Sequence, residues 1–374
     1  MYPAPFALER FFARHEFSAR YLMSCSDPEG IVVADLLERA DPESRRLWDG
    51  LTLGYTESLG LPALREEIAG LYRDVRADDV LVAAPEECIF LAMNSLLEAG
   101  DHVVCTFPGY QSLYQLALSL GCEVTFWQPV EADRWHFDPS TLADLVRPNT
   151  KLIVWNFPHN PTGALPTREE FDDMLAVVAS SGAALFSDEM YRLLEPTPEL
   201  RLPPAIDCHG RAVSLSGMSK SFGMAGLRIG WVATKDAALL ERMATLKDYT
   251  TICSSAPSEV LALMALRTGD DILDGHRRRL SRNIALAAGF FANHAQAFRW
   301  VPPEAGTLCF PRLLGGEGAE TFCRRALREA GILLLPSPVF GYGDSHFRLG
   351  LGRDGFPEGM SRLDEYLASS ACSR

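Results

Sequence analysis

The chain has 374 residues, which is too long for one small domain but suits a large α/β domain with a smaller one, or two comparable domains. Hydrophobic residues make up 47% of it and charged residues 22%, a composition that excludes wholesale disorder. Lys and Arg number 35 against 49 Asp and Glu, and the resulting net charge of −14 argues against a nucleic acid or an anionic membrane surface as a partner.

Neither a targeting segment nor a membrane span is expected from the sequence. Residues 1–18 carry Glu9, Arg10 and Arg14 among their apolar residues, unlike a signal peptide. The longest apolar run, Ile284 to Ala292, is too short to cross a bilayer. The nine cysteines form no C-x-x-C pair, and the eight histidines show no metal-ligand spacing. We therefore expect reduced thiols in a cytoplasmic protein, and no metal site.

Strands and helices alternate in the first two thirds of the chain. An irregular arm, broken by Asp27-Pro28 and Asp41-Pro42, comes first. A helix is expected after Leu61-Pro62, because proline suits the first helical turn. The expected strands that follow are 80–83, 102–106, 123–127, 152–155, 183–186, 213–215 and 229–233, with helices over 85–97 and 111–120 between the first three.

Apolar strands between amphipathic helices predict a parallel sheet that is covered on both faces. The pattern changes after about Ser254, where longer helices alternate with short strands. The expected helices there are 258–266, 273–294 and 319–329, and the expected strands are 332–335 and 346–349. We therefore predict an arm over residues 1–44 that packs with a small α+β domain, 254–374, and a large domain over residues 45–253.

Three polar motifs follow buried strands of the predicted large domain. Lys220, after Ser219, is either a solvated loop lysine or an amine that adds to a carbonyl group. Asn160 begins the turn-forming run Asn-Pro-Thr-Gly. Asp188, three residues before Tyr191, is either a helix cap or a partner for a protonated ring nitrogen. Each motif has a structural explanation by itself, but all three at successive strand ends predict a ligand site at that edge of the sheet.

With these motifs the sequence resembles the fold type I, pyridoxal-phosphate (PLP) dependent aminotransferases of class I and II. The resemblance extends from about Gly54 to Arg353 and rests on N-P-T-G, D-x-x-Y, S-K with an arginine eight residues on, and a late arginine. It implies a mostly parallel sheet of the seven-stranded type between helices, a smaller α+β C-terminal domain, and PLP as cofactor. It also implies a homodimer with active sites at the subunit interface.

The resemblance assigns roles around the cofactor. Lys220 matches the lysine that joins PLP as a Schiff base and later moves the proton. Asp188 matches the acid that pairs with the ring nitrogen, where a carboxylate favours the protonated ring. Asn160 and Tyr191 match the pair that hydrogen-bonds the phenolic oxygen of PLP. Tyr110 matches the aromatic residue that stacks on the ring.

It also assigns roles at the phosphate and at the substrate. Arg228 matches the phosphate-binding arginine, with Ser219 as a nearby hydroxyl partner. Tyr55 matches a tyrosine that reaches the phosphate of the neighbouring subunit. Arg348 matches the arginine that grips the substrate α-carboxylate beside Asn160, a role that suits its bidentate fork. Taken singly, Arg228, Tyr55 and Arg348 are equally typical of surface or interface side chains.

Two positions depart from the family pattern. Before the helix that receives the phosphate, the family has Gly-Ala where this sequence has Ala84-Pro85-Glu86. A helix N-terminus still offers amides and a favourable dipole, so we expect the amide of Glu86 to bind the phosphate and its side chain to point away. Gly217 stands where a phosphate-binding serine or threonine is usual, and Ser219 or Ser216 is expected to compensate.

The leading hypothesis is an aminotransferase that moves an amino group between an L-amino acid and a 2-oxo acid by a ping-pong Schiff-base mechanism. A rival is a PLP-dependent cyclase, lyase or oxidase of the capreomycidine-synthase type, which the Phe157-Pro-His159 and Tyr110-Gln-Ser segments also resemble. A transcription regulator on this fold would carry a basic DNA-binding domain before Gly54, which the sequence lacks. With no second clearly placed arginine for a dicarboxylic substrate, aromatic or aliphatic amino acids are the default expectation. The candidate residues of the substrate pocket are Ser24 to Gly30 of the arm, Tyr110 and Gly306-Thr307.

Overall fold

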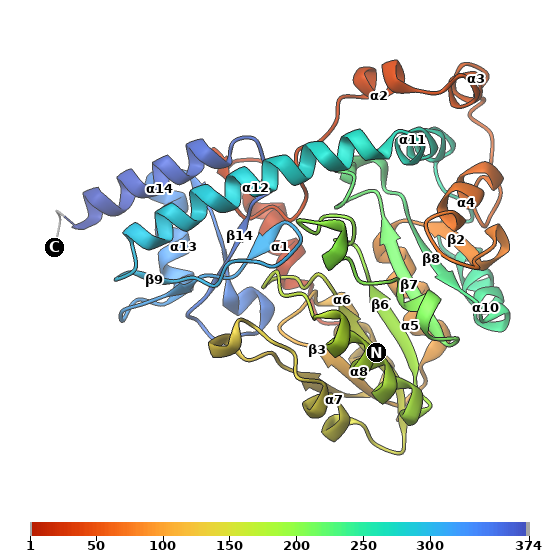
Figure 1. Ribbon diagram of the computed structural model, residues 1–374, viewed down its shortest axis with the longest axis horizontal. Coiled ribbons are helices and arrows are strands. Elements are labelled where there is room, and N and C mark those ends of the chain that lie inside the picture. Colours follow the sequence, from red (N-terminus) through yellow and green to blue (C-terminus); the bar gives the residue numbers. More distant parts are fainter. Residues whose placement is uncertain (1, 372–374) are drawn as a thin grey trace.

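A seven-stranded sheet forms the centre of the computed structural model, which describes residues 2–371 (Figure 1). The strand order is β2-β8-β7-β6-β5-β3-β4. Neighbouring strands are parallel, except that β8 runs antiparallel to both β2 and β7. The strands are β2 (Val80–Ala83), β3 (His102–Thr106), β4 (Glu123–Trp127), β5 (Thr150–Asn156), β6 (Ala184–Asp188), β7 (Ala212–Gly217) and β8 (Gly230–Thr234). The predicted mostly parallel, seven-stranded sheet is confirmed.

Helices cover both faces of this sheet, because successive residues of each strand alternate between two apolar cores. In β5, Leu152 and Val154 enter one core, whereas Ile153 and Trp155 enter the other. The first core is covered by α5 (Pro85–Leu96), α6 (Ser112–Leu120) and α10 (Ala237–Lys247), and the second by α7 (Pro139–Leu145) and α8 (Arg168–Ser181). Each large apolar side chain that is fully buried in this way stabilises the fold by about 1.5–3 kcal/mol.

Longer helices and short strands follow the sheet in the chain. The helices are α11 (Ala256–Arg267), α12 (Gly269–Asn293), α13 (Ala319–Ala330) and α14 (Phe356–Ala371). The strands are β9 (Phe298–Arg299), β10 (Leu308–Cys309), β11 (Arg312–Leu313), β12 (Ile332–Leu333), β13 (Leu335–Pro336) and β14 (Phe347–Gly350). Figure 1 shows α12, α13 and α14 together on the left, beside the large sheet on the right.

The N-terminal arm divides between these two parts. After α1 (Ala7–His15), β1 (Tyr21–Leu22) pairs in parallel with β12 through Tyr21 and Ile332. The next two helices, α2 (Val33–Arg39) and α3 (Pro42–Asp49), pack on α11 instead. The domain boundaries after residues 44 and 253 stay a prediction.

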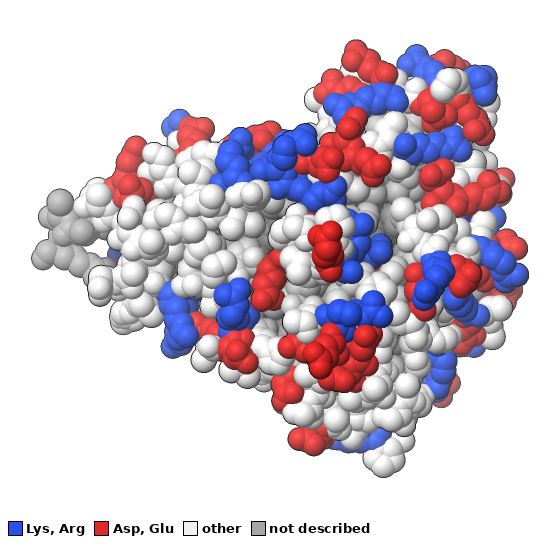
Figure 2. All heavy atoms as spheres, viewed as in Figure 1, with Lys and Arg blue, Asp and Glu red and all other residues white. Residues whose placement is uncertain are grey.

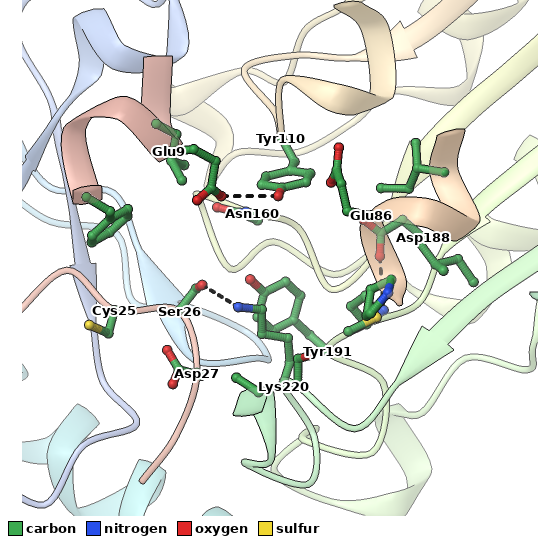
Figure 3. Close-up of a pocket in the computed structure, with 18 of the residues that line it drawn as sticks. Glu9, Cys25, Ser26, Asp27, Glu86, Tyr110, Asn160, Asp188, Tyr191 and Lys220 are labelled. Atoms are coloured by element: carbon green, nitrogen blue, oxygen red, sulfur yellow. Dashed lines mark hydrogen bonds between the residues drawn. The ribbon is translucent and has the colours of Figure 1, made fainter. Parts of the chain in front are cut away.

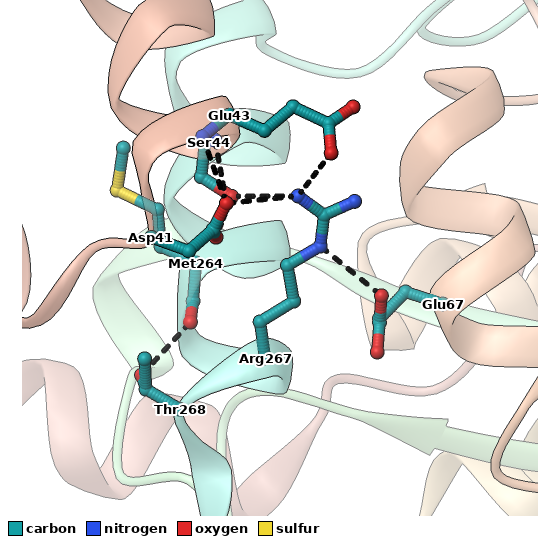
Figure 4. Close-up of polar contacts among 7 residues, drawn as sticks. All are labelled: Asp41, Glu43, Ser44, Glu67, Met264, Arg267 and Thr268. Carbon is teal, nitrogen blue, oxygen red and sulfur yellow. Dashed lines mark hydrogen bonds and ion pairs between the residues drawn. The ribbon is translucent and has the colours of Figure 1, made fainter.

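Arg267, the last residue of α11, joins three helices (Figure 4). Its Nη1 donates to Asp41 and Glu43, each at 3.3 Å, and its Nε donates to Glu67 of α4 (Pro62–Ala69) at 3.1 Å. Asp41 also accepts hydrogen bonds from the amides of Glu43 and Ser44, which caps α3. One guanidinium therefore fixes α3 and α4 against α11.

The structure contains elements that the sequence pattern did not predict. Helices α7, α8, α9 (Ala205–Cys208), α10 and α14 are among them. A signal for α8 was present, because Thr167 and Glu170 form a capping box at its start. The single strand expected over 332–335 is two strands, since Ile332 pairs with β1 and Leu335 pairs with β14.

The surface carries both signs of charge, and Figure 2 shows acidic and basic side chains interspersed over much of one face. Along α12, Arg277 pairs with Asp274, and Arg279 pairs with Asp354. Within residues 2–371, no helix has the length and apolarity needed to cross a membrane.

Eight of the nine cysteines lie within this range, and all eight are free thiols. The ninth, Cys372, lies outside the described residues. The cytoplasmic location that we inferred from cysteine usage stays a prediction.

Candidate active site

A cavity of about 310 Å³ opens at the carboxyl ends of the central parallel strands (Figure 3). Parallel strands of this kind place ligands at that edge of the sheet. Nine of the ten residues predicted to form the site line the cavity: Glu86, Tyr110, Asn160, Asp188, Tyr191, Ser219, Lys220, Arg228 and Arg348. The tenth, Tyr55, does not.

Lys220 follows β7, and its side chain reaches across the cavity toward the N-terminal arm (Figure 3). Its Nζ donates a hydrogen bond to the hydroxyl of Ser26 at 2.8 Å. Burial lowers the pKa of the Lys220 amine. A lower pKa leaves more of the amine uncharged, which is the form that attacks a carbonyl group or accepts a proton.

Asp188 is the last residue of β6 and is only 5% exposed. Its Oδ1 accepts a hydrogen bond from the amide of Met190 at 3.1 Å, and the amide group of Asn156 donates to its carbonyl oxygen at 3.0 Å. Burial raises the pKa of the Asp188 carboxyl to about 7. Among the described residues no cation pairs with this carboxylate, so a protonated ring nitrogen beside it would supply the missing charge.

Arg348, in β14, is a buried cation with 1% exposure. Its Nη2 and Nε donate to the carbonyl oxygen of Ser24 at 2.9 and 3.2 Å, and its Nη1 donates to Oδ1 of Asn160 at 3.3 Å. The guanidinium also lies over the rings of Phe12 and Phe340, 5.6 and 5.7 Å from their centroids. Burial lowers its pKa, and no carboxylate of the described chain pairs with it. A ligand carboxylate would complete its coordination.

Tyr191 lies beside these groups. It is 4% exposed, lines the cavity, and stands near the Lys220 side chain in Figure 3. Burial raises the pKa of its hydroxyl, which therefore remains a hydrogen-bond donor at neutral pH.

The prediction for the Glu86 side chain was wrong. The carboxyl group lines the cavity instead of pointing away, and it accepts a hydrogen bond from the hydroxyl of Ser112 at the start of α6. Burial raises its pKa, which favours the neutral form and so weakens the like charge that we expected to drive the side chain outward. Beside it, the Tyr110 hydroxyl donates to Oε1 of Glu9 at 3.3 Å.

The start of α5 and the segment after β7 also line the cavity. Ser219 is 5% exposed, and within residues 2–371 its hydroxyl has no hydrogen-bond partner. Arg228 is exposed and stays close to its own loop, where its Nη1 donates to the carbonyl oxygen of Ala225 at 3.0 Å. A free hydroxyl, a guanidinium and a helix N-terminus suit an anion such as a phosphate group.

The structure explains the glycine at position 217. A Cβ atom on Gly217 would lie 2.8 Å from Cα of Gly230 and 3.0 Å from the carbonyl oxygen of Ile229. Both contacts are with the backbone of the neighbouring strand, so a side chain at 217 would push β7 and β8 apart. The hydroxyl group usual at this position is therefore excluded by close strand packing.

Tyr55 lies on the surface, with 90% of its area exposed. Leu53 and Tyr249 are nearly as exposed, at 89% and 86%. The two loops that carry them are neighbours, because Ser58 donates to Asp248 at 3.3 Å.

The residues that sequence reasoning missed are on α1 and just after it. Glu9 and Phe12 of α1 and Glu16 after it line the cavity beside Cys25 to Asp27, which belong to the expected segment 24–30. The apolar pair Leu8 and Phe12, one helical turn apart, was the signal for a helix there.

The comparisons with known proteins agree with this geometry. The family model for aminotransferase class I and II matches residues 31–357. Capreomycidine synthase of Streptomyces vinaceus is 29% identical over 374 residues, covering 98% of this chain and 95% of the relative. An aspartate aminotransferase of Thermococcus kodakarensis is 27% identical, covering 99% of this chain and 95% of the relative.

Two solved structures cover nearly the whole chain. A PLP-dependent aminotransferase from Streptococcus suis has a TM-score of 0.91 and 30% identity, with 99% of each chain covered. The PLP-dependent cyclase OrfR has a TM-score of 0.88 and 29% identity, with 99% of this chain and 98% of the other covered.

Proposed function

Because the chain belongs to the aminotransferase class I and II family, we propose that it is a PLP-dependent enzyme which moves an amino group from an L-amino acid to a 2-oxo acid. The observation that carries the proposal is the meeting of three groups in one cavity. These are the amine of Lys220, the buried carboxyl of Asp188 and the guanidinium of Arg348, which has no carboxylate partner among the described residues.

The residues present fit PLP. Asp188 would face the ring nitrogen, Tyr110 the ring, and the free hydroxyl of Ser219 would meet the phosphate together with Arg228 and the start of α5. Asn160 and Tyr191 would hold the phenolic oxygen. When bound, PLP supplies an electron-withdrawing ring that stabilises negative charge at the α-carbon of the substrate.

Side chains of the protein bind the substrate, transfer the proton and exclude water. Arg348, oriented by Ser24 and Asn160, binds the α-carboxylate and so fixes the α-carbon relative to Lys220. The Lys220 amine, whose pKa burial lowers, accepts the α-proton and later returns it. Tyr110 and the arm cover the cavity and limit the access of water.

A second candidate is a PLP-dependent cyclase. It is favoured by the similarity of the whole chain to capreomycidine synthase and to the cyclase OrfR. Both candidates begin with loss of the α-proton to Lys220 and differ in whether a 2-oxo acid must accept the amino group.

We further propose a homodimer. The exposed Leu53, Tyr55 and Tyr249 form an apolar surface on two adjacent loops, which a second copy of the chain would cover. In such a dimer Tyr55 would reach the phosphate of the partner's cofactor. Sedimentation of the wild type and of Leu53→Asp tests this, since a dimer that persists in the variant would argue against this surface.

Two measurements test the function. The purified protein should be yellow with PLP, and the colour should be lost in Lys220→Ala. A set of L-amino acids is then assayed with and without a 2-oxo acid. Conversion that requires the 2-oxo acid supports transamination, whereas cyclic product, ammonia or peroxide formed without it supports the rival. A colourless protein that takes up no PLP would refute both.

A further inference from the structure

Ser26 and Asp27 of the arm are anchored to the C-terminal part of the chain. The hydroxyl of Thr307, which is fully buried, donates to the carbonyl oxygen of Ser26 at 2.6 Å. Asp27 pairs with Arg353, whose Nη2 lies 2.6 Å from Oδ2. Neither contact uses the side chain of Ser26. The Ser26 hydroxyl is therefore presented to the cavity from a fixed backbone.

This hydroxyl is the partner of the Lys220 amine. Nζ of Lys220 donates to it at 2.8 Å, and within residues 2–371 the amine has no other acceptor and no ion-pair partner. The Ser26 hydroxyl also acts on Tyr191. Burial raises the pKa of the tyrosine hydroxyl, whereas the charge of Arg348 and the Ser26 hydroxyl lower it. Ser26 thus lies where Lys220 and Tyr191 meet (Figure 3).

A hydroxyl group suits an amine that must stay uncharged in order to react. Burial lowers the pKa of Lys220, and the charge of Asp27 opposes this effect without outweighing it. A carboxylate in the place of the Ser26 hydroxyl would favour the ammonium ion, which has no lone pair. A neutral acceptor instead takes one N–H and leaves the lone pair of the uncharged amine free to accept a proton.

The position of the α-carboxylate gives an independent indication of the geometry. Ser24, two residues before Ser26, accepts from Nη2 of Arg348 at 2.9 Å. Arg348 has no carboxylate partner among the described residues, so a substrate α-carboxylate would bind it beside Ser24. The α-carbon then lies in the cavity that Lys220 and Ser26 also line. One segment of the arm therefore holds both the guanidinium that binds the carboxylate and the amine that takes the α-proton.

We propose that Ser26 is a positioning residue, whose hydroxyl holds the uncharged Lys220 amine with the lone pair of Nζ toward the substrate α-carbon. This rests on the proposed function, which assigns the α-proton to Lys220. In the step itself the lone pair takes the proton, and the electron pair of the C–H bond stays at the α-carbon. The resulting ammonium group keeps one N–H on Ser26 until it returns the proton, so the contact serves both directions of transfer.

The first test follows PLP uptake by the cofactor-free protein, which measures the attack of the Lys220 amine on the aldehyde carbon of PLP. Rates of colour formation are taken at the high-pH plateau, where the amine is uncharged. In Ser26→Ala the rate should fall about threefold to tenfold, because the amine loses the acceptor that orients it. Ser26→Thr keeps a hydroxyl group and should stay within about twofold of the wild type.

The second test is hydrogen exchange at the α-carbon, which reports proton transfer whether or not a 2-oxo acid is required. The PLP-loaded proteins are incubated in D2O with a mixture of the standard protein L-amino acids, and mass spectrometry identifies the amino acid that gains deuterium. For that amino acid, the limiting exchange rate of Ser26→Ala should be about tenfold to a hundredfold below that of the wild type. Its half-saturating concentration should change less than about threefold, because Arg348 still binds the carboxylate.

Ser18→Ala is the matched control. Ser18 lies on the same arm but is exposed, and its hydroxyl donates only to the carbonyl oxygen of His15, at 3.1 Å. It does not line the cavity. Removal of this hydroxyl should leave the rate of PLP uptake and the rate of exchange at their wild-type values.

The outcomes separate this proposal from the proposed function. A yellow Ser26→Ala protein with the wild-type rate in either test would overturn the role of Ser26 and leave the cofactor and the reaction standing. Equal losses in Ser26→Ala and Ser26→Thr would also overturn it, since the hydroxyl would then not be the cause. So would a raised half-saturating concentration at an unchanged limiting rate. A wild type that takes up no PLP, or exchanges no α-hydrogen, would refute the proposed function and this proposal with it.

Discussion

Arg348, which lines the cavity, and Ser24 join segments from the two ends of the chain. Nη2 and Nε of the arginine both donate to the serine carbonyl oxygen, at 2.9 and 3.2 Å. The residues are 324 positions apart, yet the arm is thereby attached to the group that we assign to the substrate carboxylate. One side chain therefore connects the arm to the position that we assign to the substrate carboxylate.

Arg348→Lys should weaken amino acid binding without weakening cofactor binding. Lysine keeps the charge but cannot donate to Ser24 and to a carboxylate with the same planar fork. We expect the half-saturating amino acid concentration to rise about a hundredfold, with the affinity for PLP unchanged. The visible absorbance of the loaded variant gives both values, and an unchanged amino acid titration would contradict the assignment.

Arg267→Met should destabilise the fold without touching the cavity. The methionine keeps much of the apolar stem but removes the charge that joins Asp41, Glu43 and Glu67. Because the arginine side chain is only 21% exposed, we expect a loss of about 1–3 kcal/mol in the free energy of unfolding. Urea denaturation measures it.

A matched control for this variant lies on α3. Arg45 pairs with Asp49 four residues on, and its side chain is 49% exposed. Arg45→Met should therefore cost no more than about 0.5 kcal/mol. Equal losses in the two variants would show that the three-helix cluster contributes no more than an ordinary surface pair.

The sheet was predictable because its strands carry continuous apolar runs between turn-forming residues. Val80–Ala83, His102–Thr106 and Glu123–Trp127 have the predicted bounds in the structure. The C-terminal strands were harder, since two-residue strands such as β12 and β13 carry no periodicity of their own. Their pairing depends on tertiary contacts with β1 and β14.

The cavity could be predicted where residues follow a strand, as Asp188 and Lys220 do. The direction of the Glu86 side chain could not, because it depends on Ser112 from another helix and on burial that shifts its pKa. The contribution of α1 was missed for a similar reason. Glu9 and Glu16 have the sequence pattern of ordinary surface acids, and only the placement of α1 brings them to the cavity.

Gly217→Ser should fail to improve the site, although it restores a hydroxyl group at the usual position. The added Cβ would meet the backbone of Ile229 and Gly230 at 3.0 and 2.8 Å. We expect a loss of about 1–3 kcal/mol in stability, measured by thermal unfolding of the cofactor-free protein. Gly210→Ser, at a glycine with no atom near its Cβ position, is the control. A Gly217→Ser protein of native stability that binds PLP more tightly would contradict the packing argument.

Asp188 should make the stability of the cofactor-free protein depend on pH. Burial raises the pKa of its carboxyl from 3.8 to about 7, so the folded state holds this proton more tightly than the unfolded chain. The contribution of Asp188 to stability is therefore fully present below pH 3.8 and is lost as the pH rises through about 7. The loss amounts to at most about 4 kcal/mol.

Asp188→Asn removes this dependence. Urea denaturation of the cofactor-free proteins should show the variant and wild type closely matched near pH 4, with the variant more stable at pH 8 by up to a few kcal/mol. Loading with PLP should make the wild type the more stable protein at pH 8. A protonated ring nitrogen stabilises the ionised Asp188 carboxyl in the wild type, whereas the variant has no charge at this position. A stability difference that is the same at both pH values would mean that the buried carboxyl does not titrate in this range.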